Sequence, residues 1–183
     1  MEAAVQKRTQ INHFLYSVQN GIRISLVLLF EAGLLYLLFG ICLRPLRISG
    51  YSMEPTLEKG NIVLVNRIYR FWEKPQRGDL IVFEDERGTF VKRIIGFPGE
   101  TVEVISGEVF IDSCPVEESY ANQLIGDASP LLVPEGSVYV LGDNRSEMYD
   151  SRMEEVGCIP LDRIEGIVRI RLFPLNRIVL FRS

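Results

Sequence analysis

The chain has 183 residues, of which 47% are hydrophobic, and its formal net charge is −4. This acidic balance argues against nucleic acid as the main partner, because phosphate binding requires a basic surface. The only histidine, His13, precedes the apolar segment described next. A Ser-His-Asp triad, a Cys-His pair and a histidine-ligated zinc site are therefore excluded from the rest of the chain.

An apolar segment over residues 24–43 predicts a transmembrane helix, because about twenty helical residues span the roughly 30 Å hydrocarbon core of a bilayer. Glu31 costs about 3 kcal/mol there, but the Ile, Leu, Val and Phe residues contribute about −5 kcal/mol in total. The segment is too long and begins too late for a cleaved signal peptide. We expect a cytoplasmic segment over 1–22, an anchor over 23–43 and an extracytoplasmic domain over 44–183.

Short runs rich in Val, Ile and Phe follow residue 48, separated by Gly, Pro, Asp and Asn, and this pattern is typical of strands. The dipeptide Ser106-Gly107 between two such runs indicates a hairpin, whereas residues 113–136 are expected to form a long loop. The predicted fold is mainly β, a coiled or folded-over antiparallel sheet with one N-terminal transmembrane helix. The expected strands are residues 61–69, 79–84, 89–96, 101–105, 108–112, 137–143, 166–172 and 177–181.

The three cysteines, Cys42, Cys114 and Cys158, form no C-x-x-C pair. This spacing excludes a zinc ribbon and a thioredoxin-like motif. Two alternatives remain for Cys114 and Cys158, namely a disulfide in an oxidising compartment or two unpaired thiols.

Ser52 lies between Gly50 and Pro55, in a turn that can expose a hydroxyl and direct backbone N–H groups at one point. A serine in such a turn is usually structural, so this position alone is weak support for catalysis. Lys92 changes the balance, because in a strand it shares a face with Phe90 and Ile94. Burial there would lower the pKa of its amine and allow it to take the proton from Ser52. The alternative is a lysine that extends to water at a strand edge.

Four motifs occur in one order along the chain and together resemble the type I signal peptidases. Residues 52–57 resemble the S-M-x-P-T box of that family, and residues 78–83 resemble its G-D-I-V-V-F strand. Residues 91–100 resemble its K-R-x-x-G-x-P-G-[DE] box, and residues 142–152 resemble its G-D-N-R…D-S-R box. The resemblance covers about residues 22–175.

The resemblance implies a membrane-bound serine endopeptidase that removes signal peptides from exported preproteins, on the outer face of the plasma (inner) membrane and without metal or cofactor. Ser52 would be the nucleophile, with its backbone N–H in the oxyanion hole, and Lys92 would be the general base. Residues that match shallow pockets for Ala-x-Ala cleavage sites are Ile48, Met53, Leu57, Phe90 and Val91. Residues expected to support the oxyanion or the lysine are Gly50, Asp143, Asn144, Arg145, Ser146, Asp150, Ser151 and Arg152.

Two positions depart from the common family pattern. Gly50 stands where many members have a hydroxyl residue that donates to the oxyanion, although another subset of the family also has glycine there. Met148 stands where a serine usually hydrogen-bonds the lysine, so Ser146, Ser151, Tyr149 or a water molecule would have to replace it. These departures keep open a non-catalytic anchored β domain that acts as a scaffold or binding partner. A soluble, self-cleaving repressor-type Ser-Lys protease is a further alternative, but the membrane segment and the G-D-N-R box argue against it.

Overall fold

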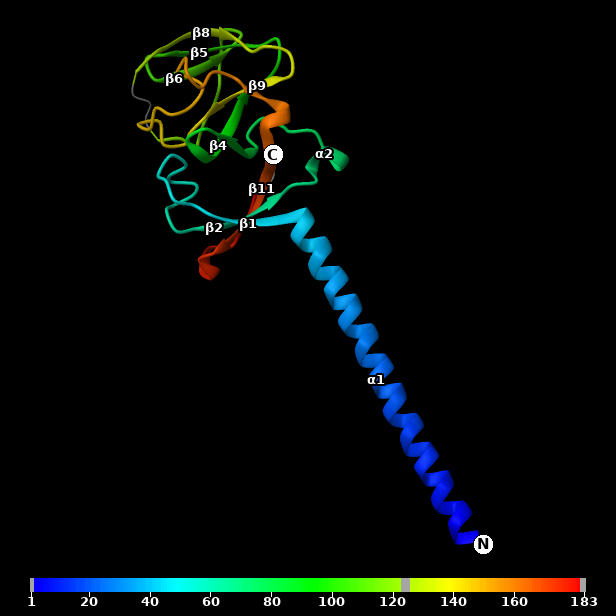
Figure 1. Cartoon of the computed structure of the whole chain (residues 1–183). Helices are drawn as coiled ribbons and strands as arrows, with labels where there is room; N and C mark the ends of the chain where they lie inside the picture. Colours follow the sequence, from blue (N-terminus) through cyan, green and yellow to red (C-terminus); the bar gives the residue numbers. More distant parts are fainter. Residues whose placement is uncertain (1, 123–125, 182–183) are drawn as a thin grey trace. The chain divides into compact units, whose positions relative to one another are not determined.

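The computed structural model describes residues 2–122 and 126–181, with the side chains of 2–14, 38–39, 70 and 72 left out. The chain divides into two compact units, Met1–Ile41 and Cys42–Ser183. The first unit is formed by helix α1 (Glu2–Cys42), whose last residue belongs to the second unit, and the second unit contains the strands (Figure 1).

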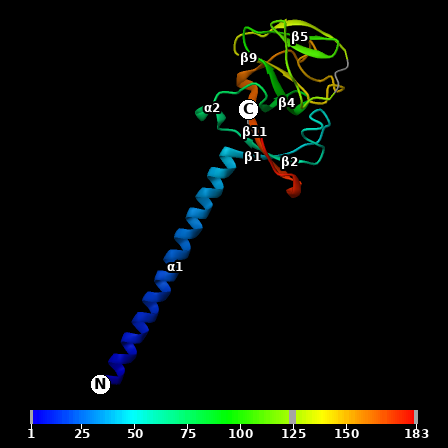
Figure 2. The ribbon, with the colours of Figure 1, turned by 180° about the vertical axis from the view of Figure 1, so that it is seen from behind.

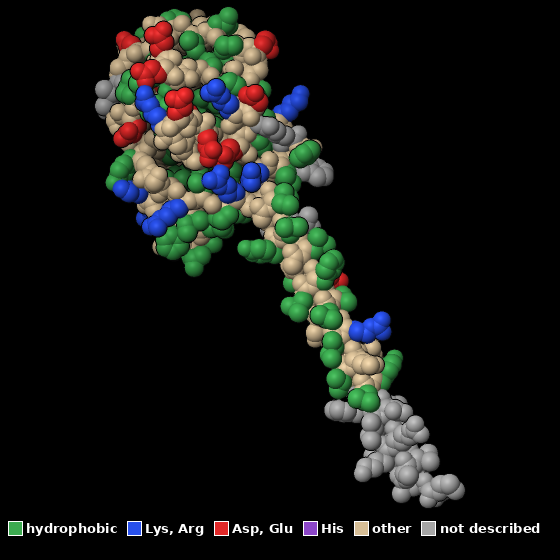
Figure 3. Space-filling view, viewed as in Figure 1, with side chains coloured by type: hydrophobic (Ala, Val, Ile, Leu, Met, Phe, Trp, Pro, Cys, Tyr) green, Lys and Arg blue, Asp and Glu red, His purple; other side chains and the backbone are tan. Residues whose placement is uncertain are grey.

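Helix α1 carries a stretch that is long and apolar enough to cross a bilayer. This stretch, Leu15–Cys42, has 28 residues and a mean hydropathy of 2.3, and none of its most apolar part is buried within the protein. Figure 3 shows apolar side chains along the described part of the helix. The helix ends at Cys42 rather than at the expected position 43, because Leu43 begins strand β1 and pairs with Asn66.

The larger sheet of the second unit has eight strands, and all of its pairs are antiparallel. Its order is β1-β2-β11-β3-β4-β9-β10, with β12 added to β11. The strands are β1 (Leu43–Arg47), β2 (Ile62–Asn66), β3 (Leu80–Asp85), β4 (Gly88–Gly96), β9 (Ser137–Leu141), β10 (Ile159–Pro160), β11 (Ile164–Phe173) and β12 (Val179–Leu180). Short helices α2 (Tyr69–Trp72), η1 (Leu161–Arg163) and η2 (Leu175–Arg177) lie in its connections.

The larger sheet carries apolar side chains on both faces, because successive residues of a strand point in opposite directions. On β3, Leu80 and Val82 join a buried cluster with Met53, whereas Ile81 and Phe83 join a second cluster on the other face. One face of β3 therefore packs against the turn that carries Met53, and the other face packs within the second apolar cluster.

The smaller sheet has the order β7-β6-β5-β8, and Figures 1 and 2 show its β5 at the end of the unit away from β1 and β2. Its strands are β5 (Thr101–Ile105), β6 (Glu108–Ile111), β7 (Cys114–Pro115) and β8 (Ala128–Leu132). Ser106 and Gly107 join β5 to β6 with φ values of 51° and 86°, as a tight hairpin turn requires.

The mainly β prediction with one N-terminal apolar helix is confirmed, with three corrections. The strands form two sheets rather than one, and two strands, β7 and β8, lie inside residues 113–136, where the sequence predicts a loop. Strand β8 contains Pro130, which an edge strand tolerates because its outward N–H needs no partner, and most of β8 is exposed, so no alternating apolar pattern marks it. The expected strands at 61–69 and 177–181 are shorter, at Ile62–Asn66 and Val179–Leu180.

Candidate functional site

A cavity of about 520 Å³ lies where the turn after β1 meets the beginning of β4. Strand β4 pairs with β3 along this stretch, but its pairing with β9 begins only at Arg93. The other edge of residues 89–92 therefore has no strand partner among the described residues, and the cavity lies at this edge. Site residues predicted from the sequence that line it are Ile48, Gly50, Ser52, Met53, Phe90, Val91 and Lys92.

The turn that carries Ser52 is held by the loop after β9. The backbone N–H of Asn144 donates to the Ser52 carbonyl oxygen at 3.0 Å, and Asn144 Nδ2 donates to the Tyr51 carbonyl at 3.2 Å. Within the turn, Leu57 N donates to the Met53 carbonyl at 2.7 Å. Ser52 itself is partly exposed and lines the cavity, while these bonds fix the backbone of its turn.

Gly142, the first residue after β9, brings the serine turn and the lysine together. A Cβ atom built on Gly142 would lie 2.5 Å from the Ser52 carbonyl oxygen and 3.4 Å from Lys92 Nζ. Both atoms therefore lie within 3.4 Å of one point. Only glycine leaves this space free, so Gly142 is a site residue that the sequence motif contained but that was not assigned a role.

Lys92 is completely buried in the middle of β4. It lies opposite Ile81 of β3, on the face that also carries Phe90 and Ile94, as predicted. Its Nζ has no hydrogen-bond partner among the described residues. Burial lowers the pKa of the amine below its ordinary value, an effect that the Asp150 carboxylate partly opposes. The shift is in the direction that a general base requires, toward the uncharged amine.

The three side chains considered as replacements for the missing serine at Met148 are all hydrogen-bonded elsewhere. Ser146 Oγ donates to Asn144 Oδ1, Ser151 Oγ accepts from Val140 N, and the Tyr149 hydroxyl donates to the Asp85 carboxylate. None of these three side chains bonds to Lys92 Nζ in this structure. Of the predicted replacements, a water molecule stays a prediction.

A buried ion pair ties β4 to the loop after β9. Arg93 donates to both carboxylate oxygens of Asp143, at 2.8 Å and 2.6 Å, and Thr56 Oγ1 donates to Asp143 Oδ2 at 2.5 Å. Asp143 is completely buried. The network thus joins the loop after β9, β4 and the serine turn, and its members Arg93 and Thr56 were not predicted. The sequence could have indicated both residues, because Arg93 directly follows Lys92 and Thr56 is the threonine of the S-M-x-P-T box.

A second ion pair fixes the far end of the same loop. Arg152 donates to both oxygens of Asp150 at 2.8 Å, and Gly142 N donates to Asp150 Oδ2 at 3.2 Å. Arg152 Nη1 also donates to the Arg145 carbonyl at 2.9 Å. Asp150 thus binds Gly142 beside Lys92, and its carboxylate also acts on the amine, whose pKa it raises against the effect of burial.

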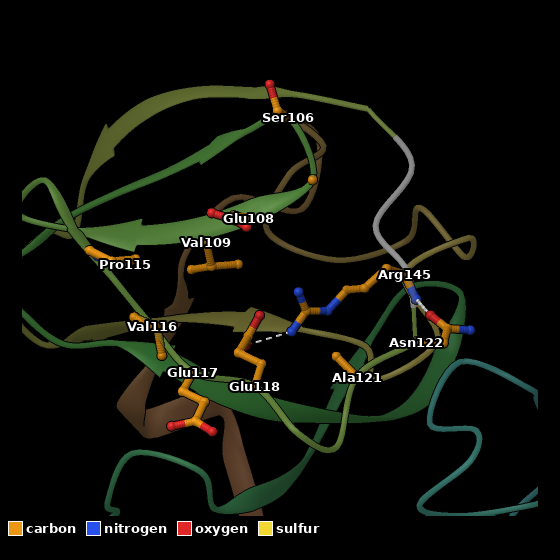
Figure 4. A pocket seen from close by; sticks show the side chains of 11 residues that line it. Ser106, Glu108, Val109, Pro115, Val116, Glu117, Glu118, Ala121, Asn122 and Arg145 are labelled. Carbon is orange, nitrogen blue, oxygen red and sulfur yellow. Dashed lines mark hydrogen bonds and ion pairs between the residues drawn. The ribbon is translucent and has the colours of Figure 1, made fainter.

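Arg145 anchors the middle of the loop and is fully buried. Its Nε donates to the Gly142 carbonyl at 2.8 Å, and its Nη2 forms an ion pair with Glu118 at 2.6 Å. Figure 4 shows its guanidinium directed toward Val109 and Glu118, in a separate cavity of about 590 Å³. Arg145 therefore does not line the cavity that contains Ser52 and Lys92, but it holds the loop after β9 through the Gly142 carbonyl.

The remaining predicted residues lie outside the cavity. Leu57 does not line it but is completely buried, in the apolar cluster that includes Ile48 and Met53.

All three cysteines are free, and burial raises the pKa of Cys158 to about 11. In the part of the chain that is described, no group of three or more His, Cys, Asp and Glu side chains could hold a metal ion.

Known proteins provide an independent comparison. A family model described as signal peptidase, peptidase S26, matches residues 21–173. Signal peptidase I of Bacillus licheniformis is 35% identical over 148 residues, which cover 74% of this chain and 79% of the relative. Signal peptidase I of Leptolyngbya laminosa is 39% identical over 142 residues, which cover 72% of this chain and 69% of the relative.

A signal peptidase I from Enterococcus faecalis V583, known from a crystal structure, is 34% identical, with a TM-score of 0.46. This likeness covers 52% of this chain and 97% of that chain. The family model spans most of the chain, including the serine turn, β4 and the loop after β9. The chain belongs to the signal peptidase family, peptidase S26.

Proposed function

We propose that this serine endopeptidase is anchored in the membrane and removes signal peptides with Ser52 as nucleophile and Lys92 as general base. Family membership supports signal-peptide removal as the overall activity. The observation that carries the assignment of the two residues is that a completely buried amine and the partly exposed Ser52 line one cavity.

The chemistry follows from the two groups. Uncharged Lys92 Nζ takes the proton from Ser52 Oγ, and the oxygen attacks the scissile carbonyl carbon. The resulting oxyanion accepts a hydrogen bond from the Ser52 backbone N–H. When the C–N bond breaks, the Lys92 ammonium returns the proton to the leaving amine. Uncharged Lys92 Nζ then takes a proton from a water molecule, whose oxygen attacks the acyl-enzyme carbonyl carbon. The bond from that carbon to Ser52 Oγ breaks, and Lys92 returns the proton to Ser52 Oγ.

The substrate is proposed to bind as an extended segment along the unpaired edge of β4. Ile48, Met53, Phe90 and Val91 give the cavity an apolar lining beside the reacting groups. A preprotein with small residues before the cut, of the Ala-x-Ala type, matches this lining.

Helix α1 is proposed as a single-pass anchor, with the peptidase unit on the extracytoplasmic face of the plasma (inner) membrane. The supporting observation is the exposed apolar stretch Leu15–Cys42, whose length exceeds what a bilayer requires. Protease protection of the second unit in sealed, right-side-out and inverted vesicles tests this orientation. Digestion only in right-side-out vesicles is expected, and digestion only in inverted vesicles would refute it.

The assay for the two residues uses detergent-solubilised full-length protein and a precursor with an Ala-x-Ala site. Ser52→Ala and Lys92→Ala should each abolish cleavage. Matched controls are Ser129→Ala and Lys74→Ala, which replace exposed residues outside the cavity and should leave the rate unchanged. Cleavage that persists in Ser52→Ala or Lys92→Ala would refute the assignment.

The pH dependence provides a second test, since the active form has an uncharged Lys92. The rate should rise with pH and reach its plateau below the ordinary lysine pKa, because burial lowers that pKa. A rate insensitive to this ionisation would count against Lys92 as the base. Chelators should have no effect.

A scaffold or binding protein that retains the fold is the second candidate function. It is favoured by Gly50, which provides no side-chain donor to an oxyanion, and by the absence of a hydrogen bond to Lys92 Nζ from any described residue. No cleavage by the folded parent protein, across precursors and pH, would support it.

A further inference from the structure

Tyr149 is a wall of the candidate site that the sequence motif did not assign to substrate binding. It lines the same cavity as Ser52, Lys92 and Phe90, and its side chain is only partly buried. It comes directly before Asp150, whose carboxylate is fixed by Arg152. The backbone at Tyr149 is therefore held in place, and the direction of the side chain is set by its own contacts.

Three contacts hold the aromatic ring. The hydroxyl donates to the Asp85 carboxylate at the end of β3. The ring lies 4.7 Å from the ring of Phe90, centroid to centroid, and the Arg87 guanidinium carbon lies 4.7 Å from the Tyr149 centroid. Arg87 is itself paired with Glu155 at 2.7 Å. A ring held by a hydrogen bond, an aromatic pair and a cation has little freedom to move aside.

The contact with Phe90 determines what this wall does. Phe90 shares its face of β4 with Lys92, and it stacks on the buried Phe83 at 5.8 Å. The Phe90 ring is therefore in contact with two other rings, that of the buried Phe83 and that of Tyr149. At 4.7 Å between centroids, the Phe90 and Tyr149 rings leave no space between them for a substrate side chain.

We propose that Tyr149 is a specificity-determining residue that limits the size of the substrate side chain accommodated beside Phe90. This inference rests on the proposed peptidase function. A shorter residue at position 149 would uncover the outer face of Phe90 and extend the cavity in that direction. In the unmodified protein, the Tyr149 ring occupies this volume and so excludes larger substrate side chains, in addition to the limit set by the shallow apolar lining.

The test compares full-length Tyr149→Ala with the parent on precursors that carry Ala, Val, Leu or Phe at the first or the third residue before the cut. A single methylene group in an apolar pocket changes selectivity by about 10–200-fold. We therefore expect kcat/KM for Leu or Phe, relative to Ala, to rise by about tenfold or more at one of these positions. Tyr149→Phe keeps the ring and removes only the bond to Asp85, so it should retain the parent ratio.

Unchanged ratios at both positions in a folded Tyr149→Ala protein would overturn the inference. If that variant does not unfold cooperatively, Tyr149→Leu takes its place and should give a smaller shift in the same direction. Failure of the proposed function is distinguishable, because the parent would then show no Ser52-dependent cleavage of any precursor. A shift in Tyr149→Phe equal to that in Tyr149→Ala would also refute a steric wall, since the ring is still present.

Discussion

Replacement of Gly142 by alanine tests how tightly the reacting groups are positioned. The new Cβ would lie 2.5 Å from the carbonyl oxygen of Ser52, a backbone atom that cannot rotate away, and 3.4 Å from Lys92 Nζ. Ordinary contacts of a Cβ atom begin at about 3.4 Å. The serine turn must therefore retreat by roughly 1 Å, or the loop after β9 must shift by the same amount.

A displacement of this size in Ser52, the proposed nucleophile, is expected to reduce kcat by about 100-fold, equivalent to about 2.7 kcal/mol in the activation free energy. The effect should fall mainly on kcat, since most of the cavity lining is unchanged. The assay is steady-state cleavage of an Ala-x-Ala precursor by the purified variant, with kcat and KM measured separately.

Gly166→Ala is the matched control, because its Cβ would meet another backbone oxygen, that of Asn66, at 2.6 Å. Gly166 lies on β11 and does not line the cavity. Both variants should lose stability, and this loss is measured by thermal unfolding. If kcat of folded Gly142→Ala falls no further than that of folded Gly166→Ala, the close approach at Gly142 has no special role in catalysis.

Three further predictions concern the oxyanion, the buried ion pair and the buried amine. A Cβ at Gly50 would meet nothing within 4 Å, so Gly50→Ser should fold normally and raise kcat roughly tenfold through a new hydroxyl donor, with Gly50→Ala as the control without a hydroxyl. Asp143→Ala leaves the Arg93 charge buried without its partner and should lower the free energy of unfolding by about 3–5 kcal/mol in chemical denaturation. The pKa of Lys92 is lower in the folded than in the unfolded chain, so the unfolded chain binds more protons between the two values and stability rises with pH across that window. Lys92→Met should therefore be more stable than the parent at pH 7, and a gain that does not shrink toward pH 10.5 would contradict burial of the amine.

Sequence patterns predicted the structure correctly where it depends on residues that are neighbours in the chain. The alternation that placed Lys92 with Phe90 and Ile94 is confirmed, because a strand fixes which side chains share a face whatever lies next to it. The hairpin at Ser106-Gly107 is confirmed for the same reason, since its positive φ values are a local requirement.

Sequence patterns did not predict those strands that form because a partner strand is available, rather than because of their own residues. Strand β8 is mostly exposed and contains Pro130, and it exists because β5 offers an edge for it to pair with. Strand β1 follows the apolar helix directly and contains Pro45, and it is held by β2. Neither carries an alternating apolar pattern that could be recognised without the partner strand.

The sequence by itself determined that the β-rich unit has no histidine for a Ser-His-Asp triad, because His13 is the only histidine, and on that ground it predicted Lys92 as the base. Tertiary structure decided how that lysine is controlled. The approach of Gly142 to both Ser52 and Lys92 and the position of Tyr149 against Phe90 join segments far apart in the chain. Such contacts depend on the packing of sheet and loops, and no local spacing encodes them.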